Sequence, residues 1–356
     1  MATSDYLDES DLRNIDAGGF VNEDLIQKIY DSSVGIKPIL LPMLETVSVS
    51  NSYKEWPQDE LAAPTDSRVV SGSDAGVVTE TMPNAVRLGN HAQTNVKIVN
   101  VSERALNVST VTGNILEYRT RRKTLELQRD MEAHLLGISG SVQDDGNTTP
   151  GRTAALGAWL ETNTLHGTGG SPGGFDTSTK LVKDLTPGQA RQISLDDVRD
   201  IVHEIFMNGG AASGTLTVMS VPIVIKKLSE AVRADTSGAF VAPRANISGS
   251  GSGVNQTAQG WTDTIYTDYG ITLKLVANRL QQVYESGDTP AKDVATLYFL
   301  DLEYLAKGYL HDIKIEPLAK IGLSHRRQIS VDWMSLVLLE RAHGAIFDID
   351  VSDPFA

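Results

Sequence analysis

The sequence predicts an α+β fold in which one long helix carries sheets and a compact α/β unit follows it. A charged amphipathic helix is expected over residues 114–137, and alternating strand patterns flank it on both sides. Residues 194–234 then have the pattern of a helix, a buried strand and a second helix. The 356 residues, 40% of them hydrophobic, are enough for one large or two medium domains with a real core.

The long helix has start and stop signals that agree with each other. Asn114 is a good N-cap, Glu117 stands where a capping-box partner belongs, and Gly137 is typical of a left-handed C-cap. The predicted apolar stripe consists of Leu116, Thr120, Thr124, Leu127, Met131 and Leu135, widened by Leu125 and Leu136. At about 1.5 Å per residue, this helix is roughly 35 Å long, enough to cross a domain.

The composition excludes several classes of protein. The chain has no cysteine, which removes disulfides, thiolate metal sites and cysteine nucleophiles and fits a reducing cytoplasm. Its net charge of −14 argues against a protein whose main task is to grip nucleic-acid phosphates. The N-terminus is acidic and polar, unlike a signal peptide, and no apolar run approaches the ~18 residues of a membrane span.

Residues 1–46 are predicted to form an arm rather than a domain. Residues 1–31 hold eight acidic and two basic side chains, and a short helix is indicated by the apolar stripe of Leu25, Ile26, Ile29 and Tyr30. Because such a segment cannot bury itself, we expect it to lie on a neighbouring molecule. A tail that packs on its own domain is the alternative.

From Val47 to Val111 the pattern is that of β-strands. Alternation is visible in TVSVSNSYKEW and in NVKIVNVSERALNVSTV, where the apolar parity changes near Asn100. The residues between these runs are rich in Gly, Ser, Pro, Asp and Thr. A two-stranded excursion with few large apolar side chains is marginal alone, so we expect it to rest on something outside its own domain. An ordinary long loop is the alternative.

A glycine-rich tract follows the long helix, with one apolar island from Ala154 to Leu160. Its glycine cluster lacks the Gly-Lys-Ser/Thr ending of a phosphate-binding loop, which excludes that interpretation for Gly167, Gly169, Gly170, Gly173 and Gly174. The nearby acidic residues Asp144 and Asp145 miss the calcium-loop pattern. We therefore expect a mobile or contact-making loop.

The compact unit begins at Ser194, which with Asp197 predicts a capping box for a helix that ends at Gly209 and Gly210. The apolar face of this helix carries Leu195, Val198, Ile201, Val202, Ile205 and Phe206. TLTVMSV is a buried strand, and Pro222 opens the second helix. We interpret His203 as a structural residue, because no other ligand stands at metal spacing from it.

The last third of the chain is predicted to be mostly strand. Residues 241–258 form a second flexible excursion, and residues 261–282 contain two strands that meet at a turn near Asp268 to Gly270. The stretch RRQISVDWMSLVLLERAHGAIFDI predicts a closing hairpin that turns at His343 and Gly344.

The sequence predicts no catalytic residue, no cofactor and no metal site. HExxH, GxSxG, phosphate-loop and dinucleotide motifs are absent, and no two of the seven histidines stand three or four residues apart. A glycosidase pair stays open, because carboxylates are plentiful. Asp348, Asp350 and Asp353 could hold a divalent ion, although a solvated terminus is the simpler interpretation.

The order of these parts resembles the major capsid proteins of tailed phages, which have the Hong Kong 97-type fold. KTLELQRDMEAHLLG and TTPGRTAALGAWLETNT look like a subgroup from short-tailed phages. The resemblance implies an N-terminal arm at 1–46, an extended loop at 47–105, a peripheral domain at 106–190 with the spine helix 114–137, an axial domain at 191–290, and strands at 291–356 that return to the peripheral domain.

The resemblance implies a structural role without catalysis. Copies would join as hexamers and pentamers into an icosahedral or prolate head that encloses double-stranded DNA on its inner face, assembled in the bacterial cytoplasm without a membrane. The expected partners are a portal protein, a separate scaffolding protein because the chain begins directly with the arm, and in some particles a decoration protein. The expected intersubunit contacts are Leu25, Ile29, Trp56, Leu61, Val69, Val70 and Val77.

Three alternatives remain open at this point. An encapsulin-like nanocompartment shell protein has the same fold and would show a cargo-binding groove lined by the N-terminal helix. A polysaccharide-acting enzyme would show two carboxylates about 5 to 9.5 Å apart across a cleft. Another virion component, such as a decoration or tail protein, would differ in its copy number per particle.

Overall fold

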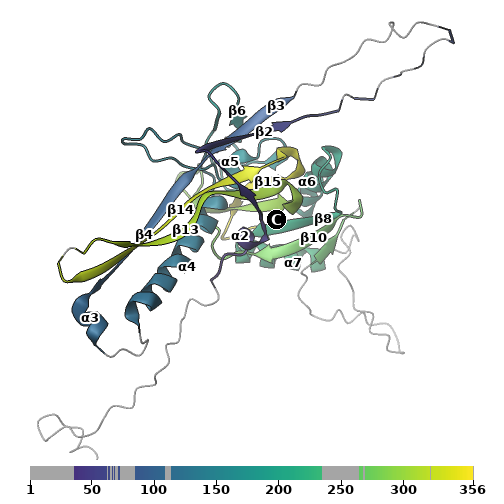
Figure 1. Ribbon diagram of the computed structural model, residues 1–356. Coiled ribbons are helices and arrows are strands. Elements are labelled where there is room, and N and C mark those ends of the chain that lie inside the picture. The colour runs from purple at the N-terminus through teal and green to yellow at the C-terminus, as the bar shows by residue number, and fades with distance from the viewer. Residues whose placement is uncertain are drawn as a thin grey trace, which may run out of the picture.

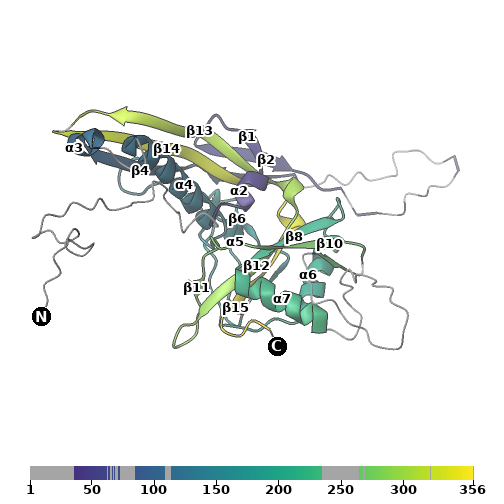
Figure 2. The same cartoon turned by 90° about the horizontal axis from the view of Figure 1, so that it is seen from below.

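The computed structural model describes residues 36–61, 63–64, 66, 68, 71–72, 85–108, 114–234, 264–267, 269–320 and 322–355. The described chain forms two units, an elongated one built on a four-stranded sheet and a long helix, and a compact one built on a seven-stranded sheet. Figure 1 shows the strands of the elongated unit reaching away from the compact unit. Figure 2, seen from below, shows the compact unit lying beneath one end of the elongated unit.

The four-stranded sheet brings together strands from distant parts of the chain. Its order is β1 (Glu45–Ser48), β13 (Leu305–Leu318), β14 (Ser324–Val337) and β4 (Gln93–Ser102). β1 runs parallel to β13, and the other two pairings are antiparallel. β4 pairs with β14 without interruption, so the parity change near Asn100 does not break the register. Val99 and Val101 are therefore buried, while Val96 and Ile98 face outward.

The long helix, α4 (Ile115–Leu135), packs on β4 and β14. Its predicted N-cap is confirmed, because Asn114 Oδ1 accepts hydrogen bonds from the backbone N–H groups of Leu116 and Glu117. The predicted C-cap is wrong. The helix ends with Leu136 as the cap residue, and Gly137 lies outside the left-handed region while its N–H donates to His134 O. Leu125, predicted in the buried stripe, is exposed and lines a groove between α4 and the strands β13 and β14.

The seven-stranded sheet forms the compact unit. Its order is β5 (Thr164–Leu165), β15 (Gly344–Asp350), β12 (Asp293–Leu300), β8 (Thr215–Ser220), β10 (Thr272–Ala277) and β9 (Thr264–Tyr266), with β11 (Tyr284–Glu285) paired to β12. The helices α6 (Leu195–Met207) and α7 (Pro222–Ala234) contact this sheet. The capping box of Ser194 and Asp197 is confirmed, and so is Pro222 as the first residue of α7.

The remaining elements are short. The extended hairpin consists of β2 (Tyr53–Gln58) and β3 (Val86–His91), and a second two-stranded pair consists of β6 (Phe175–Asp176) and β7 (Leu181–Val182). Single-turn helices are α2 (Leu40–Met43), α3 (Glu103–Asn107), α5 (Leu156–Trp159), η3 (Leu302–Tyr304) and η4 (Glu340–Ala342). None of the helices described is both long enough and apolar enough to cross a bilayer.

The end of the chain does not form the predicted hairpin. β14 belongs to the four-stranded sheet and β15 to the seven-stranded sheet, so the two arms of the expected hairpin lie in different units. The resemblance implies that the strands of residues 291–356 return to the peripheral domain. Of these strands, only β13 and β14 lie in the sheet beside the long helix. β12 and β15 are almost wholly buried, because they are central strands of the compact unit.

Each unit has its own hydrophobic core. One cluster joins α4, the four-stranded sheet and the apolar island around Trp159, and the other joins α6, α7 and the seven-stranded sheet. β12 contributes to both, because its side chains alternate between the two clusters: Phe299 lies in the second and Leu300 in the first. The orientation of the two units is therefore fixed by buried side chains.

Candidate intersubunit surfaces

The extended hairpin is rooted in the core of its own chain. In the antiparallel pairing Trp56 stands opposite Leu88, and both side chains are buried. The Trp56 ring lies 5.6 Å from that of Trp159, which in turn stacks on Phe175 at 5.8 Å. Aromatic contacts of this kind contribute beyond the area that they bury. The root of the hairpin is therefore part of the folded body.

A buried polar network fixes the direction of β3. Asn90 is fully buried, and its Nδ2 donates to Thr153 Oγ1 at 2.9 Å and to Ser335 O at 2.9 Å. Its Oδ1 accepts from the backbone N–H groups of His91 and Ala154 at 2.9 and 3.2 Å. Because every polar atom of this amide has a partner, the network links the hairpin, the apolar island and β14 without a desolvation penalty.

The residues predicted to contact neighbouring subunits have different positions. Trp56 is 8% exposed and packs inside its own chain, so its indole is a root residue rather than a free contact surface. Leu61, beyond the end of β2, is 95% exposed and is available for a partner. Leu25, Ile29, Val69, Val70 and Val77 lie outside the described residues, so the contacts predicted for them remain predictions.

A small cavity of about 230 Å³ lies beside the hairpin root. It is lined by several carboxylates and by aromatic rings, which include Asp59, Glu60, Glu161, Trp159, Phe175 and Glu340. Two of the carboxylates already have partners. Glu60 pairs with Arg341 at 3.1 Å, and Glu340 accepts hydrogen bonds from the backbone N–H groups of Glu161 and Thr162 at 2.7 and 2.9 Å. The first contact ties Glu60, two residues beyond β2, to η4, and the second ties the residues after α5 to η4.

The start of the described chain is bound to α4 by a buried carboxylate. Glu132 has no exposed surface, and its Oε1 accepts from the N–H groups of Ile39 and Leu40 at 3.0 and 2.7 Å. Its Oε2 accepts from Leu41 N at 2.7 Å, and Asn278 Nδ2 donates to Oε1 at 2.7 Å. A buried carboxylate is stable only when hydrogen bonds replace its water. Glu132 thus joins the arm, the long helix and the compact unit.

A buried histidine, His343, lies where β12 ends and β15 begins. His343 Nδ1 accepts a hydrogen bond from Asp301 N at 3.2 Å, so the ring is neutral with its proton on Nε2. Asp301 follows β12, and His343 immediately precedes β15. Burial disfavours the imidazolium form and lowers the pKa of His343 to about 4. The junction therefore contains a base that stays neutral near pH 7.

The glycine-rich tract is packed rather than free. A Cβ at Gly167 would lie 1.9 Å from Gln189 O, one at Gly140 would lie 2.2 Å from Val182 O, and one at Gly173 would lie 2.3 Å from Ala158 O. Of the expected mobile or contact-making loop, the mobile alternative is wrong for these positions, because glycine is required where two backbones approach closely, and the contact-making alternative stays a prediction. Buried Asp348 Oδ2 accepts from Gly167 N at 2.9 Å and holds the tract on β15.

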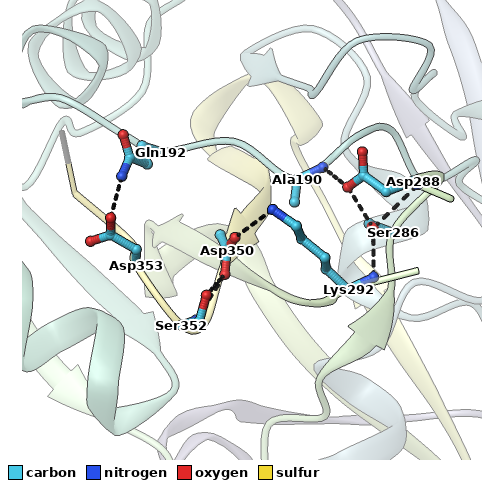
Figure 3. Close-up of polar contacts among 8 residues, drawn as sticks. All are labelled: Ala190, Gln192, Ser286, Asp288, Lys292, Asp350, Ser352 and Asp353. Atoms are coloured by element: carbon cyan, nitrogen blue, oxygen red, sulfur yellow. Dashed lines mark hydrogen bonds and ion pairs between the residues drawn. The ribbon is translucent and has the colours of Figure 1, made fainter. Parts of the chain in front are cut away.

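The carboxylates near the C-terminus serve structural contacts, as Figure 3 shows for those of Asp350, Asp353 and Asp288. Asp350 accepts from Ser352 and pairs with Lys292 at 3.3 Å, while Asp353 accepts from Gln192 Nε2 at 2.6 Å. Asp288 accepts from Ala190 N at 2.8 Å. Among the residues that the structure describes, no three His, Asp or Glu side chains are grouped to hold a metal ion. The structure therefore gives no support to the divalent-ion hypothesis.

An aromatic patch lies on the compact unit. Phe206, predicted on the buried face of α6, is about half exposed and stacks on Tyr269 at 5.0 Å. His203 is exposed, and its Nδ1 lies 2.7 Å from Tyr269 Oη, so this histidine contacts the patch while its structural role stays a prediction. Met207 and Tyr266 are also exposed. Exposed apolar groups that lie together are typical of contact surfaces.

Sequence reasoning missed Glu132 and Asn90. One signal for Glu132 was present, because it lies within one turn of the buried residues Met131, Leu135 and Leu136. Asn90 has no such signal, since its partners Thr153 and Ser335 are 63 and 245 residues away in the chain. Contacts of that range become visible only when the strands are paired.

Comparisons with known proteins agree with this architecture. Residues 13–350 match the family described as SU10 major capsid protein. No curated protein matches the sequence. Among solved structures, a chain from Mycobacterium phage Bobi has a TM-score of 0.56 at 13% identity, over 94% of this chain and 97% of that one. The capsid of a native GTA particle has a TM-score of 0.54 at 12% identity, over 93% and 96%. The SrpI encapsulin of Synechococcus elongatus has a TM-score of 0.54 at 12% identity, over 97% and 98%.

Proposed function

Because this chain belongs to the SU10 major capsid protein family and has the Hong Kong 97-type fold, it is a structural protein of a phage head shell, and we propose how its copies join. The extended hairpin, the N-terminal arm and the compact unit supply the contacts between subunits. Membership of a family of structural shell proteins implies a role without catalysis and a location in the virion.

The extended hairpin provides the main support for the proposed contacts between subunits. Its root is held by the Trp56 to Trp159 contact and by the Asn90 network, while Leu61 just beyond the root is almost fully exposed. A hairpin with a fixed root and an exposed apolar side chain just beyond it is suited to contact an adjacent subunit. In this arrangement Leu61, Val69, Val70 and Val77 pack on the neighbour.

We also propose the other partners that a closed shell around DNA requires. Subunits form hexamers and pentamers around double-stranded DNA, a portal protein occupies one vertex, and a separate scaffolding protein guides assembly in the bacterial cytoplasm. A decoration protein is an optional addition to the outer surface. The net charge of −14 argues against tight binding of DNA phosphates, so in this proposal the DNA is enclosed by the shell rather than gripped by it.

The alternative of a nanocompartment shell shares the fold, so fold similarity alone does not separate the two functions. The matched family favours the phage head, because its description names a major capsid protein over nearly the whole chain. The nature of the packaged content, DNA or a protein cargo, distinguishes them in purified particles.

A deletion tests the role of the hairpin. The root residues Tyr53–Gln58 and Val86–His91 must stay, since Trp56, Leu88 and Asn90 belong to the folded body. Residues 61–84 are replaced by Asn-Gly, which leaves a five-residue connection between the paired Gln58 and Val86, a length that is common in hairpins. We expect a folded subunit with unchanged circular dichroism that forms no closed shells by light scattering and negative-stain microscopy.

The matched control keeps the hairpin length and replaces residues 61–84 with a Gly/Ser sequence. This variant should also fail, because it lacks the apolar contact residues. Normal shells from either variant, under conditions in which the wild type assembles, would contradict the proposed role of the hairpin.

A further inference from the structure

A groove runs along one side of α4, beside the four-stranded sheet. It has a volume of about 630 Å³ and lies between α4 and the far halves of β13 and β14. Leu125 on the helix is 52% exposed and Ile315 on β13 is 49% exposed, and both line the groove. Two apolar side chains from different elements, both turned into one concave surface, are typical of a docking site.

The groove leads directly to the place where the arm is bound. The groove-lining positions Glu117, Arg121, Leu125 and Gln128 step by four, four and three residues along one stripe of α4, and Glu132 is the next position on that stripe. Glu132 lies four residues beyond Gln128, about 6 Å along the helix axis. Because Glu132 holds the N–H groups of residues 39–41, the chain that precedes Ile36 starts at one end of the groove.

The chemistry of the groove matches the sequence of the arm. Besides the apolar pair, the groove presents the guanidinium groups of Arg121 and Arg327 and one carboxylate, that of Glu117. The arm sequence FVNEDLIQKIYD at residues 20–31 carries Leu25 and Ile29 four residues apart, with three acidic side chains and one lysine. An acidic amphipathic segment complements a groove that presents two apolar side chains and two guanidinium groups.

We propose that the groove holds residues 22–31 of the arm of the same chain, with Leu25 and Ile29 packed against Leu125 and Ile315. The lengths agree. From Gln128 to Glu117 the groove follows about 16 Å of helix, and ten helical residues span about 15 Å. The seven residues 32–38 can bridge up to roughly 23 Å, so the segment reaches the groove without leaving its own subunit.

This placement goes beyond the shell function. It removes Leu25 and Ile29 from the contacts with neighbours and leaves residues 1–21 to extend from the far end of the groove. It is a property of the unassembled subunit, so it holds or fails independently of whether the protein forms shells. The groove would otherwise receive the arm of a second copy or a segment of another protein, and the experiment separates these occupants.

Disulfide trapping tests the proposal without background, because the chain contains no cysteine. The variant with Ile29→Cys and Leu125→Cys is oxidised as a dilute, unassembled subunit. The matched control carries Ile29→Cys and Val96→Cys, since Val96 is similarly exposed on the opposite face of the same sheet. We expect an intrachain disulfide in the first variant, formed at least five times faster than in the control, as measured by mass spectrometry of proteolytic fragments.

An interchain disulfide between positions 29 and 125 would overturn the proposal and assign the groove to the arm of a second copy. Equal rates in the two variants would also overturn it, because the arm would then have no preferred face.

A second measurement does not require disulfide geometry. In a subunit that carries only Ile29→Cys, we expect Leu125→Asp to raise the rate of maleimide alkylation of the thiol about tenfold, whereas Val96→Asp leaves the rate unchanged. An unchanged rate with Leu125→Asp would show that position 29 is not covered by the groove and would overturn the proposal.

Discussion

The two sheets of this protein use similar amounts of strand in opposite ways. In the seven-stranded sheet, β12 and β15 are buried along nearly their whole length, because α6 and α7 cover one face and the rest of the body covers the other. In the four-stranded sheet, β4 alternates between partly covered and exposed side chains, and the far half of β13 is open. The central strands of the first sheet are buried within one chain, whereas the second sheet leaves apolar and polar side chains exposed and available to a neighbouring molecule.

This difference separates stability from assembly. Side chains that are buried within one chain determine whether the subunit folds, while half-covered strands offer surface that is buried only on association. Mutations in the two sheets should therefore have different readouts. The predictions below run from the largest expected loss of folding free energy to the smallest.

The largest effect is expected in the compact unit. Phe299→Ala on β12 removes a fully buried ring from the second core cluster and should lower the unfolding free energy by about 3–5 kcal/mol. The matched variant, Ile98→Ala on the outward face of β4, should cost at most about 0.5 kcal/mol, because that side chain is 48% exposed. Urea denaturation of the unassembled subunit measures both. Similar losses in the two variants would erase the distinction between the sheets.

The next effect concerns the joint between the units. Glu132→Gln replaces a buried carboxylate whose oxygens accept four hydrogen bonds, and should cost about 3 kcal/mol. Glu126→Gln on the same helix is the control, since Glu126 is partly exposed and forms a surface ion pair with Lys123. Hydrogen exchange should accelerate at the amides of Leu40 and Leu41 in the first variant alone. Unchanged exchange there would show that the carboxylate does not hold the arm.

A smaller loss is expected at the root of the hairpin. Asn90→Ala leaves buried donors and acceptors of His91, Ala154 and Thr153 without the amide, which should cost about 2–3 kcal/mol. Asn100→Ala, at an exposed position of β4, should be nearly neutral. Thermal unfolding followed by tryptophan fluorescence reports on the root directly, because Trp56 and Trp159 lie beside it. A neutral Asn90→Ala variant would mean that the network adds no stability.

The smallest effect depends on pH and concerns His343, beside the ends of β12 and β15. The pKa of His343 is lowered to about 4 in the folded chain, against an ordinary value of about 6.5 when unfolded. The unfolded state therefore binds more protons between these values, and stability present above about pH 6.5 is lost as the pH falls toward 4. Between about pH 7.5 and pH 5 the loss assigned to this residue is roughly 2 kcal/mol.

His343→Gln tests that assignment, because glutamine keeps an acceptor for Asp301 N and does not titrate. The difference in unfolding free energy between the two pH values should shrink by roughly the amount assigned to His343, whatever the variant costs at neutral pH. An equally steep pH dependence in the variant would place the titrating group elsewhere, for example at His134 or His166, whose pKa values burial also lowers.

The sequence was sufficient for elements with local signals. Four features were predicted at their places: the N-cap of α4, the capping box of α6, the strand β8 and the start of α7. Each is determined by residues that are close together in the chain. The Hong Kong 97-type fold was expected from the order of these elements. That expectation is confirmed by the family match and the solved structures.

Contacts between distant segments were not predictable in this way. Periodicity placed Leu125 and Phe206 on buried faces, but the sheet covers only part of α4, and Tyr269 rather than the core receives the ring of Phe206. The expected hairpin at His343 failed because strand pattern does not reveal the partner strand, and β15 pairs with β12 and β5. The deep burial of Trp56 likewise depends on Trp159, far along the chain.

The crowded glycines of the tract after α4 have a consequence for sequence tolerance. In a library that samples every amino acid at each position, Gly140, Gly167, Gly173 and Gly188 should accept no replacement, because a methyl group at each would overlap backbone atoms. The exposed turn at residues 144–149 lies only a few positions from Gly140, and the main-chain bonds that support it are supplied by Asp145 itself. That turn is therefore the place in this region where a peptide label can be inserted while the subunit still folds.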